Sequence, residues 1–210
     1  ATLDEVKALQ LGNTTVAEAV VDRSGITGEK MELDGYCTIE GENISIYDHQ
    51  GKHQLCTMVA LNKNVDAAYG KAVAMQVAAM NPQYVSRDDI SAEELDKIKV
   101  TTIESALNDP FTLPMPILKG LLEKAISDKV WSDEDIAIYE EKKDNMKYLP
   151  NFLSEAAKPA LAGLAVADKE AILANKIFNG LVEGRFSKQL KEICLLDQAY
   201  VKAADGKQTV

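Results

Sequence analysis

The two histidines are the residues whose type and spacing come nearest to a chemical site. His49 and His53 lie four residues apart, with Asp48 beside them. On a helix this spacing would place both imidazoles on one face, where they could ligate a metal ion. The intervening Gln50-Gly51-Lys52 is instead typical of a turn. We therefore expect an exposed hairpin tip and no metal site, and a hydrolase using a metal held by both histidines is the weakest functional alternative.

Other motifs of catalysis or nucleotide binding are incomplete. Gly51-Lys52-His53 and Gly206-Lys207-Gln208 each resemble the end of a phosphate-binding loop, but both lack the earlier glycine and the following Ser or Thr. Asp88-Asp89 and Asp133-Glu134-Asp135 lie where helices are predicted to begin, and acids there complement the helix dipole. No Ser or Cys lies in a recognisable nucleophile motif. We predict that the protein is not an enzyme and uses no cofactor.

Charge and cysteine content exclude several further classes of protein. The 23 basic and 33 acidic residues give a net charge of −10, which opposes binding to nucleic acid or to anionic lipid. No apolar run is long enough to span a membrane. Cys37, Cys56 and Cys194 are widely spaced, so we expect buried, reduced thiols. The sequence predicts a cytoplasmic protein with no nucleic-acid or membrane partner.

The first ninety residues have the pattern of an α+β unit. Short helices are predicted for residues 3–10 and 15–22, and a helix rich in alanine for residues 65–80. Between them, strand formers separated by turn residues predict three antiparallel strands, at residues 31–40, 43–49 and 53–61. We expect a three-stranded antiparallel sheet packed with helices.

The remainder of the chain is predicted to be helical. Helices are expected from Ser91 to about Leu107, from Pro114 to Ile126, after Ser132, and from Asp168 to about Glu192. Prolines and a glycine divide the stretch between the last two helices, and residues 194–202 are expected to be extended. This pattern predicts an enlarged α-helical hairpin or bundle after the sheet.

Two segments carry a resemblance to a known family. They are AMQVAAMNPQYVSRDDI, at residues 74–90, and LVEGRFSKQLKEICLLDQAYVK, at residues 181–202, which is followed by Lys207-x-Thr209-Val210. Both segments are expected to have a structural role, because Gly184 allows close helix packing and neither segment contains a catalytic motif. In this order, the segments resemble translation elongation factor Ts.

The resemblance implies a domain organisation. Residues 1–90 are similar to the second half of the family's core, residues 91–193 to its helical dimerisation region, with an insertion at about residues 108–167, and residues 194–210 to an extended tail that returns to the core. The family's N-terminal helical module and its Thr-Asp-Phe-Val wedge have no counterpart in this sequence. We therefore expect a C-terminal excerpt of a longer factor.

The resemblance also implies a function. Members of the family are guanine-nucleotide exchange factors of translation elongation in protein biosynthesis: they bind elongation factor Tu, GDP-bound or nucleotide-free, and promote GDP release. Family contacts map onto Thr27 and Gly28 before the first predicted strand, and onto Tyr47, Asp48 and His49 in the hairpin. A homodimer through the helical region is the second expected partnership. The main alternative is a helical dimerisation or adaptor domain without exchange activity.

Overall fold

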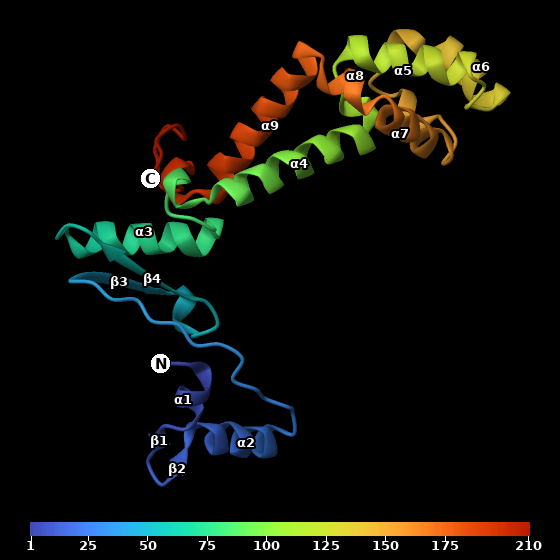
Figure 1. The fold of residues 1–210 in the computed structure, drawn as a ribbon. Coiled ribbons are helices and arrows are strands. Elements are labelled where there is room, and N and C mark those ends of the chain that lie inside the picture. The colour runs from blue at the N-terminus through green and yellow to red at the C-terminus, as the bar shows by residue number, and fades with distance from the viewer. The chain divides into compact units, whose positions relative to one another are not determined.

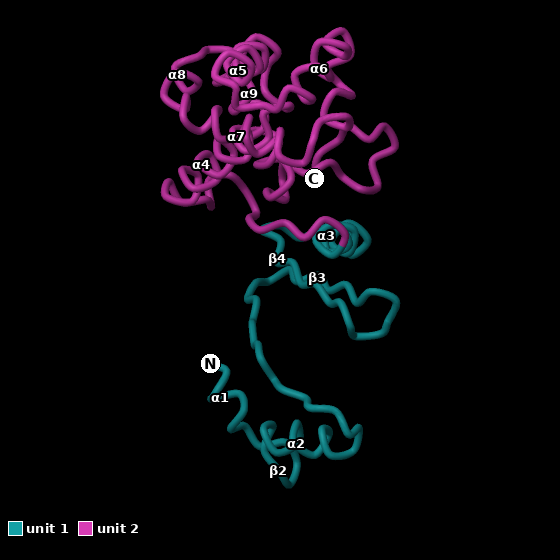
Figure 2. Tube along the Cα trace, turned by 90° about the vertical axis from the view of Figure 1, so that its right-hand side faces the viewer, with its two compact units in different colours: residues 1–78 teal, residues 79–210 magenta.

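The computed structural model describes all residues 1–210, and the chain forms two compact units, residues 1–78 and 79–210 (Figures 1 and 2). None of its helices combines the length and the apolar character that crossing a bilayer requires. The elements of the first unit are α1 (Leu3–Lys7), β1 (Gln10–Leu11), β2 (Thr14–Thr15), α2 (Val16–Thr27), β3 (Asn43–Asp48), β4 (Cys56–Leu61) and α3 (Ala67–Met80), which ends just beyond it.

Local hydrogen bonds define the two helices that open the chain. Thr2 caps α1, and Thr15 caps α2, each in a capping box with a glutamate three residues later. The α2 helix ends at Gly28, whose φ of 73° is a left-handed conformation that glycine adopts without strain. Both predicted helices are present, but the first ends at Lys7, before strand β1, and the second extends to Thr27.

The main sheet has two strands, so the prediction of a three-stranded sheet is wrong. Strands β3 and β4 pair antiparallel, from Asn43 opposite Leu61 to Asp48 opposite Cys56. Residues 31–40, the predicted first strand, form no strand. At the start of this segment, the backbone N–H of Met31 donates to Ser24 Oγ at 2.8 Å. Residues that favour strands form one only beside a neighbouring strand with which they can pair, and this exposed segment pairs with none.

Helix α3 covers one face of the β3–β4 hairpin, as the alanine-rich pattern of residues 65–80 predicts (Figure 1). Thr57 Oγ1 donates a hydrogen bond to the backbone oxygen of Ala74 at 2.7 Å. At Gly70 the helix lies so close that an added Cβ would be 3.0 Å from Ser45 Cβ. Helices with small antiparallel sheets agree with the α+β class.

The second unit is helical. Its helices are α4 (Ala92–Asn108), α5 (Met115–Ser127), α6 (Asp133–Lys142), α7 (Ala157–Ala167), α8 (Lys169–Leu173) and α9 (Lys176–Ile193). Single 3-10 turns lie at Arg87–Asp89, Pro110–Thr112, Lys143–Asn145, Leu149–Asn151 and Leu195–Asp197, and the first unit has one at His49–Gly51.

Two details of the helical prediction need correction. The helix expected from Asp168 to Glu192 is divided into α8 and α9, because the Asn175 side chain accepts from the backbone N–H of Ile177 and starts a new helix. The stretch divided by prolines contains α7, in which Pro159 lies in the first turn. A first-turn N–H has no partner within the helix, so proline is tolerated there.

A large apolar core lies among α4, α5, α7 and α9. Leu122, Leu149, Leu161 and Phe178 have no exposed surface. Trp131 is also buried, and its Nε1 donates to the backbone oxygen of Ala157 at 2.9 Å, so its polar atom is satisfied. This core gives the second unit a hydrophobic interior of its own.

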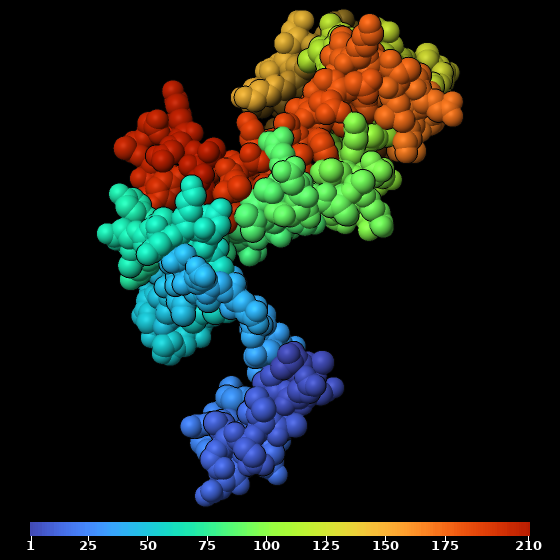
Figure 3. Space-filling model, turned by 60° about the vertical axis from the view of Figure 1, so that its left-hand side comes forward, coloured from blue at the N-terminus to red at the C-terminus, as the bar shows by residue number.

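The two segments that carry the family resemblance meet in the second unit. The backbone N–H of Gln83 donates to Ile193 O at 2.8 Å, that of Leu195 donates to Tyr84 O at 2.9 Å, and Arg87 pairs with Asp197 at 2.6 Å. After the 3-10 turn at Leu195–Asp197, the tail (red in Figure 3) folds back so that Ala199 bridges to Thr209. The segments thus form a structural junction, which agrees with their interpretation as scaffold.

Candidate partner-contact site

The tip of the β3–β4 hairpin holds three of the five predicted contact residues. Tyr47 and Asp48 end β3, and His49 begins the 3-10 turn that follows. The Tyr47 hydroxyl and His49 Nδ1 lie 2.8 Å apart in a hydrogen bond, with the two rings edge to face. His49 is exposed, whereas Tyr47 and Asp48 are half-buried. The tip therefore offers an imidazole held in place by a neighbouring phenol.

The connection between the strands is tightly turned. The residues Gln50, Gly51 and His53 have φ values of 58°, 66° and 57°, all in the left-handed region. The His49 N–H donates to Leu55 O at 2.9 Å and closes the loop. These contacts confirm the turn predicted at Gln50-Gly51-Lys52.

A cluster of three possible ligands lies at the base of this turn. His53 Nδ1 is 2.6 Å from Asp48 Oδ2, and the Cys56 thiol donates to Asp48 Oδ1 at 3.6 Å. The ligand atoms of all three residues lie within 4.8 Å of one another. Partial desolvation, and then the charge of Asp48 and its hydrogen bond, raise the pKa of the Cys56 thiol, which keeps its proton at neutral pH.

The sequence did not predict this cluster. The spacing of the histidines suggests that His49 and His53 would share a site, but His49 bonds to Tyr47 and is not part of the cluster. The missed signal was the hairpin register, because the turn sets Asp48 directly opposite Cys56. All three cysteines are free, as expected, but only Cys194 is buried, and Cys37 and Cys56 are exposed.

The other two predicted contact residues lie at the end of α2. Thr27 Oγ1 donates to Arg23 O at 3.0 Å and accepts from the Glu29 N–H at 3.3 Å, and Gly28 forms the left-handed cap of the helix. Both residues are exposed. No hydrogen bond or ion pair joins them to the hairpin tip, to which they are connected by a segment without helix or strand. The five predicted residues thus form two separate groups.

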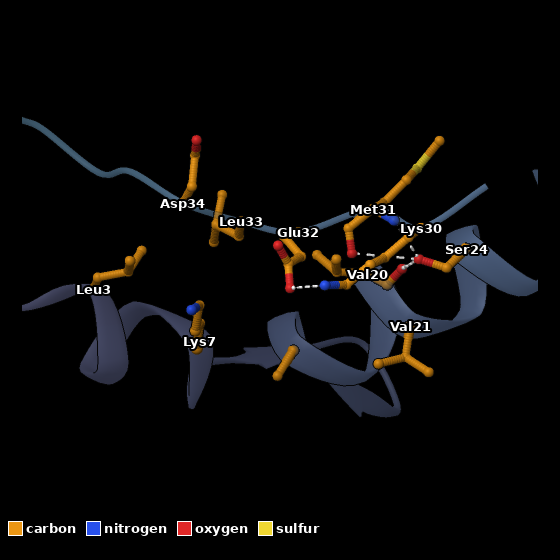
Figure 4. Close-up of a pocket in the computed structure, with 11 residues that line it drawn as sticks. Leu3, Lys7, Val20, Val21, Ser24, Lys30, Met31, Glu32, Leu33 and Asp34 are labelled. Atoms are coloured by element: carbon orange, nitrogen blue, oxygen red, sulfur yellow. Dashed lines mark hydrogen bonds and ion pairs between the residues drawn. The ribbon is translucent and has the colours of Figure 1, made fainter.

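An apolar groove of about 650 Å³ lies beside the second group (Figure 4). It runs between α1, α2 and residues 30–34, and Leu3, Val20 and Leu33 are among its lining residues. Lys30 and Glu32 form an ion pair at 2.8 Å at its edge. Neither Thr27 nor Gly28 lines the groove.

Both groups place polar side chains at the surface of the first unit. The tip presents an imidazole, a phenol and a carboxylate, and the end of α2 presents a hydroxyl beside a tight turn. Exposed polar groups of this kind can form hydrogen bonds across an interface, and their local bonds keep them oriented before binding.

Comparison with known proteins places the chain in a family. The sequence profile described as Elongation factor TS matches residues 1–210. The protein called Elongation factor Ts from Bacteroides thetaiotaomicron is 42% identical over 211 residues, and that from Phocaeicola vulgatus is 41% identical over 226 residues, each over 100% of this chain. The one from Limosilactobacillus reuteri is 34% identical over 140 residues, which are 64% of this chain and 47% of that protein.

The matches also bear on the helices between residues 108 and 167. The match to the Bacteroides protein extends over 100% of this chain, so residues 108–167 lie within the matched region. The chain spans 61% of the length of this relative and of the one from Phocaeicola vulgatus. From a profile that matches every residue and from relatives that align over the whole chain, we conclude that the chain belongs to the elongation factor TS family.

Proposed function

We propose that this chain is part of a translation elongation factor Ts, and that the whole factor acts in the cytoplasm to promote release of GDP from elongation factor Tu. The match of the family profile to all 210 residues carries this proposal. Binding of the factor and binding of GDP would weaken each other, because a coupling free energy acts equally in both directions. Exchange on this scheme needs no covalent step, and hence no nucleophile.

We propose further that the hairpin tip and the end of α2 contact elongation factor Tu, through Tyr47, Asp48 and His49 and through Thr27 and Gly28. The exposure of His49, Thr27 and Gly28 and the local hydrogen bonds of Tyr47, His49 and Thr27 support this assignment. Because the Tyr47 hydroxyl already holds the His49 ring, the ring loses little conformational freedom on binding.

Release of a fluorescent GDP analogue from elongation factor Tu tests the function. The complete factor should accelerate release, and no acceleration would overturn the proposed activity. Replacement His49→Ala should weaken the complex about threefold to tenfold, the loss expected for one interfacial hydrogen bond. The matched control Gln54→Ala changes an exposed residue of the same loop outside the proposed contacts and should leave affinity unchanged. Unchanged affinity for His49→Ala would remove the site assignment.

The missing wedge supports a second expectation. The sequence Thr-Asp-Phe-Val does not occur in residues 1–210. We propose that these residues alone accelerate GDP release weakly or not at all, while the complete factor is active. Comparable stimulation by both in the same assay would show that the wedge is dispensable.

The helical part of the chain favours a second function. Residues 91–193 include most of a core that is built entirely within the second unit, as a dimerisation or adaptor domain would require. We propose that this region mediates a homodimer, and light scattering coupled to size exclusion measures its stoichiometry. A pull-down with elongation factor Tu separates the two functions, because an adaptor without exchange activity would not retain elongation factor Tu.

A further inference from the structure

The β3–β4 hairpin brings together three side chains of different ligand chemistry. Asp48 and Cys56 are directly opposite each other in the last pair of the ladder, and His53 comes from the loop between them. The carboxylate is the centre of the group, since it accepts from the His53 ring, from the His53 backbone N–H at 3.0 Å and from the Cys56 thiol.

We propose that Asp48, His53 and Cys56 bind one divalent transition-metal ion, and that zinc is the ion that fits them best. A thiolate, an imidazole and a carboxylate are the donor types that zinc takes in proteins. A thiolate disfavours the hard ions magnesium and calcium, which prefer oxygen ligands. Three protein ligands leave a fourth position for water or for a group from a bound partner.

One of the two measured distances already fits a tetrahedral zinc ion, and the other must widen. Ligand atoms about 2.0 to 2.3 Å from the ion lie about 3.3 to 3.8 Å from one another. The Cys56 Sγ to Asp48 Oδ1 distance of 3.6 Å is already in that range. The 2.6 Å between His53 Nδ1 and Asp48 Oδ2 must widen by about 1 Å to admit the ion. The His53 side chain is 84% exposed, so its ring is free to rotate by this amount.

The loop conformation holds His53 close to the carboxylate before any ion is bound. His53 is one of few residues other than glycine with positive φ, and its backbone N–H is tied to Asp48 Oδ1. Contacts with the carboxylate occupy the His53 and Cys56 atoms that would ligate the ion. On binding, the thiol releases its proton to solvent, and the proton between Nδ1 and Oδ2 leaves or moves to Nε2.

A bound ion would join the two strands at the turn end of the hairpin. It would fix the loop from Asp48 to Cys56, a segment otherwise closed by single hydrogen bonds. This metal site does not depend on the proposed contact with elongation factor Tu, because its ligands need no second protein to assemble.

Metal analysis of the complete factor tests the site without any exchange assay. After incubation with zinc and removal of free ion, the protein should retain one equivalent. Cobalt in place of zinc should give a thiolate-to-cobalt charge-transfer band in the near ultraviolet. Replacements Cys56→Ser and His53→Gln should each lower zinc affinity at least about tenfold, and Cys56→Ser should abolish the charge-transfer band.

The chain offers matched controls for both replacements. Cys37→Ser removes the other exposed cysteine, and His49→Gln removes the other histidine. Both variants should bind zinc as the parent does, and far-ultraviolet circular dichroism checks that every variant is folded. Absence of stoichiometric zinc, or equal affinity for the Cys56→Ser and Cys37→Ser variants, would overturn the proposal. Either result leaves the exchange assay unaffected, so failure of the metal site and failure of the proposed function are distinguishable.

Discussion

The two units of the chain differ in how their residues are buried. In residues 1–78, α1, α2, β3 and β4 contain no buried residue, and burial is confined to Gly70, Ala72, Ala74 and Gln76 of α3. In residues 79–210, large side chains such as Leu122, Leu161 and Phe178 have no exposed surface. The first unit depends on helix caps and two short ladders, and the second on a packed apolar core.

This difference predicts which substitutions should affect folding and which should affect binding. An isolated two-stranded hairpin is only marginally stable, so β3 and β4 depend on their contact with α3. The outer face of the hairpin exposes Ile46 and Met58, and α2 exposes Val21 and Ile26. The proposed contacts all lie in this less buried unit, where replacing an exposed side chain costs little stability.

The largest expected effect is on the core of the second unit. Leu122→Ala should lower the free energy of unfolding by about 3 kcal/mol, because it removes buried methyl groups and leaves a cavity. Val21→Ala, at a side chain 69% exposed, should change it by less than about 0.5 kcal/mol. Urea titration followed by circular dichroism measures both. Similar losses for the two variants would contradict the contrast between the units.

Asp135 is a buried acid in the second unit, and its pKa makes that unit sensitive to acid. Burial acts to raise the pKa, but hydrogen bonds from the Ser154 N–H and from the Ser132 and Ser154 hydroxyls outweigh it and hold the pKa below its ordinary value of 3.8. A lowered folded-state pKa contributes stability that is present above the unfolded value and is lost as pH falls through the folded value.

Asp135→Asn should therefore lower the free energy of unfolding by about 2 kcal/mol at pH 7. The difference in unfolding free energy between the variant and the parent should shrink as pH falls below 4. Trp131 is the single tryptophan and lies in the same core, so its fluorescence follows unfolding of this unit. Asp133→Asn, at an exposed acid in the same turn, is the control. A deficit that stays constant between pH 7 and pH 3 would refute the role of the ionised carboxylate.

Gly70 tests the close contact between α3 and the hairpin. Gly70→Ala places a Cβ against Ser45 and 3.4 Å from Leu61 Cδ1, so α3 must move away from the hairpin. We expect a loss of about 1 to 2 kcal/mol, measured as faster hydrogen exchange in peptides from β3, β4 and α3. Adding Ser45→Gly should restore part of the protection, and unchanged exchange in Gly70→Ala would show that α3 does not support the hairpin.

The smallest effect compares one ion pair from each unit. Lys124 and Asp168 join α5 to the start of α8 at 2.6 Å and are about one third exposed, whereas Lys30 and Glu32 are mostly exposed neighbours. Double-mutant cycles should give a coupling of about 0.5 kcal/mol for the first pair and about zero for the second. Equal couplings would mean that the fold of the second unit does not strengthen its ion pairs.

Most helices could be predicted from the sequence because their signals are local. Ser91 and Ser132 cap α4 and α6 as expected, and the alanine pattern of residues 65–80 predicts α3. The two segments that resemble the family could be recognised from the sequence alone. The structure adds that they are joined by a backbone hydrogen bond from Leu195 to Tyr84. The proposed contacts were assigned by resemblance, and their contact with a partner stays a prediction.

The caps of α4 and α6, the hairpin turn and the family could be predicted from the sequence, since each depends on residues a few positions apart or on an ordered motif. Tertiary contacts instead determine that residues 31–40 form no strand, that Ser154 holds Asp135, and that His53 joins Asp48 and Cys56 rather than His49. Propensity describes what a segment can form, whereas these outcomes depend on which distant groups satisfy its hydrogen bonds.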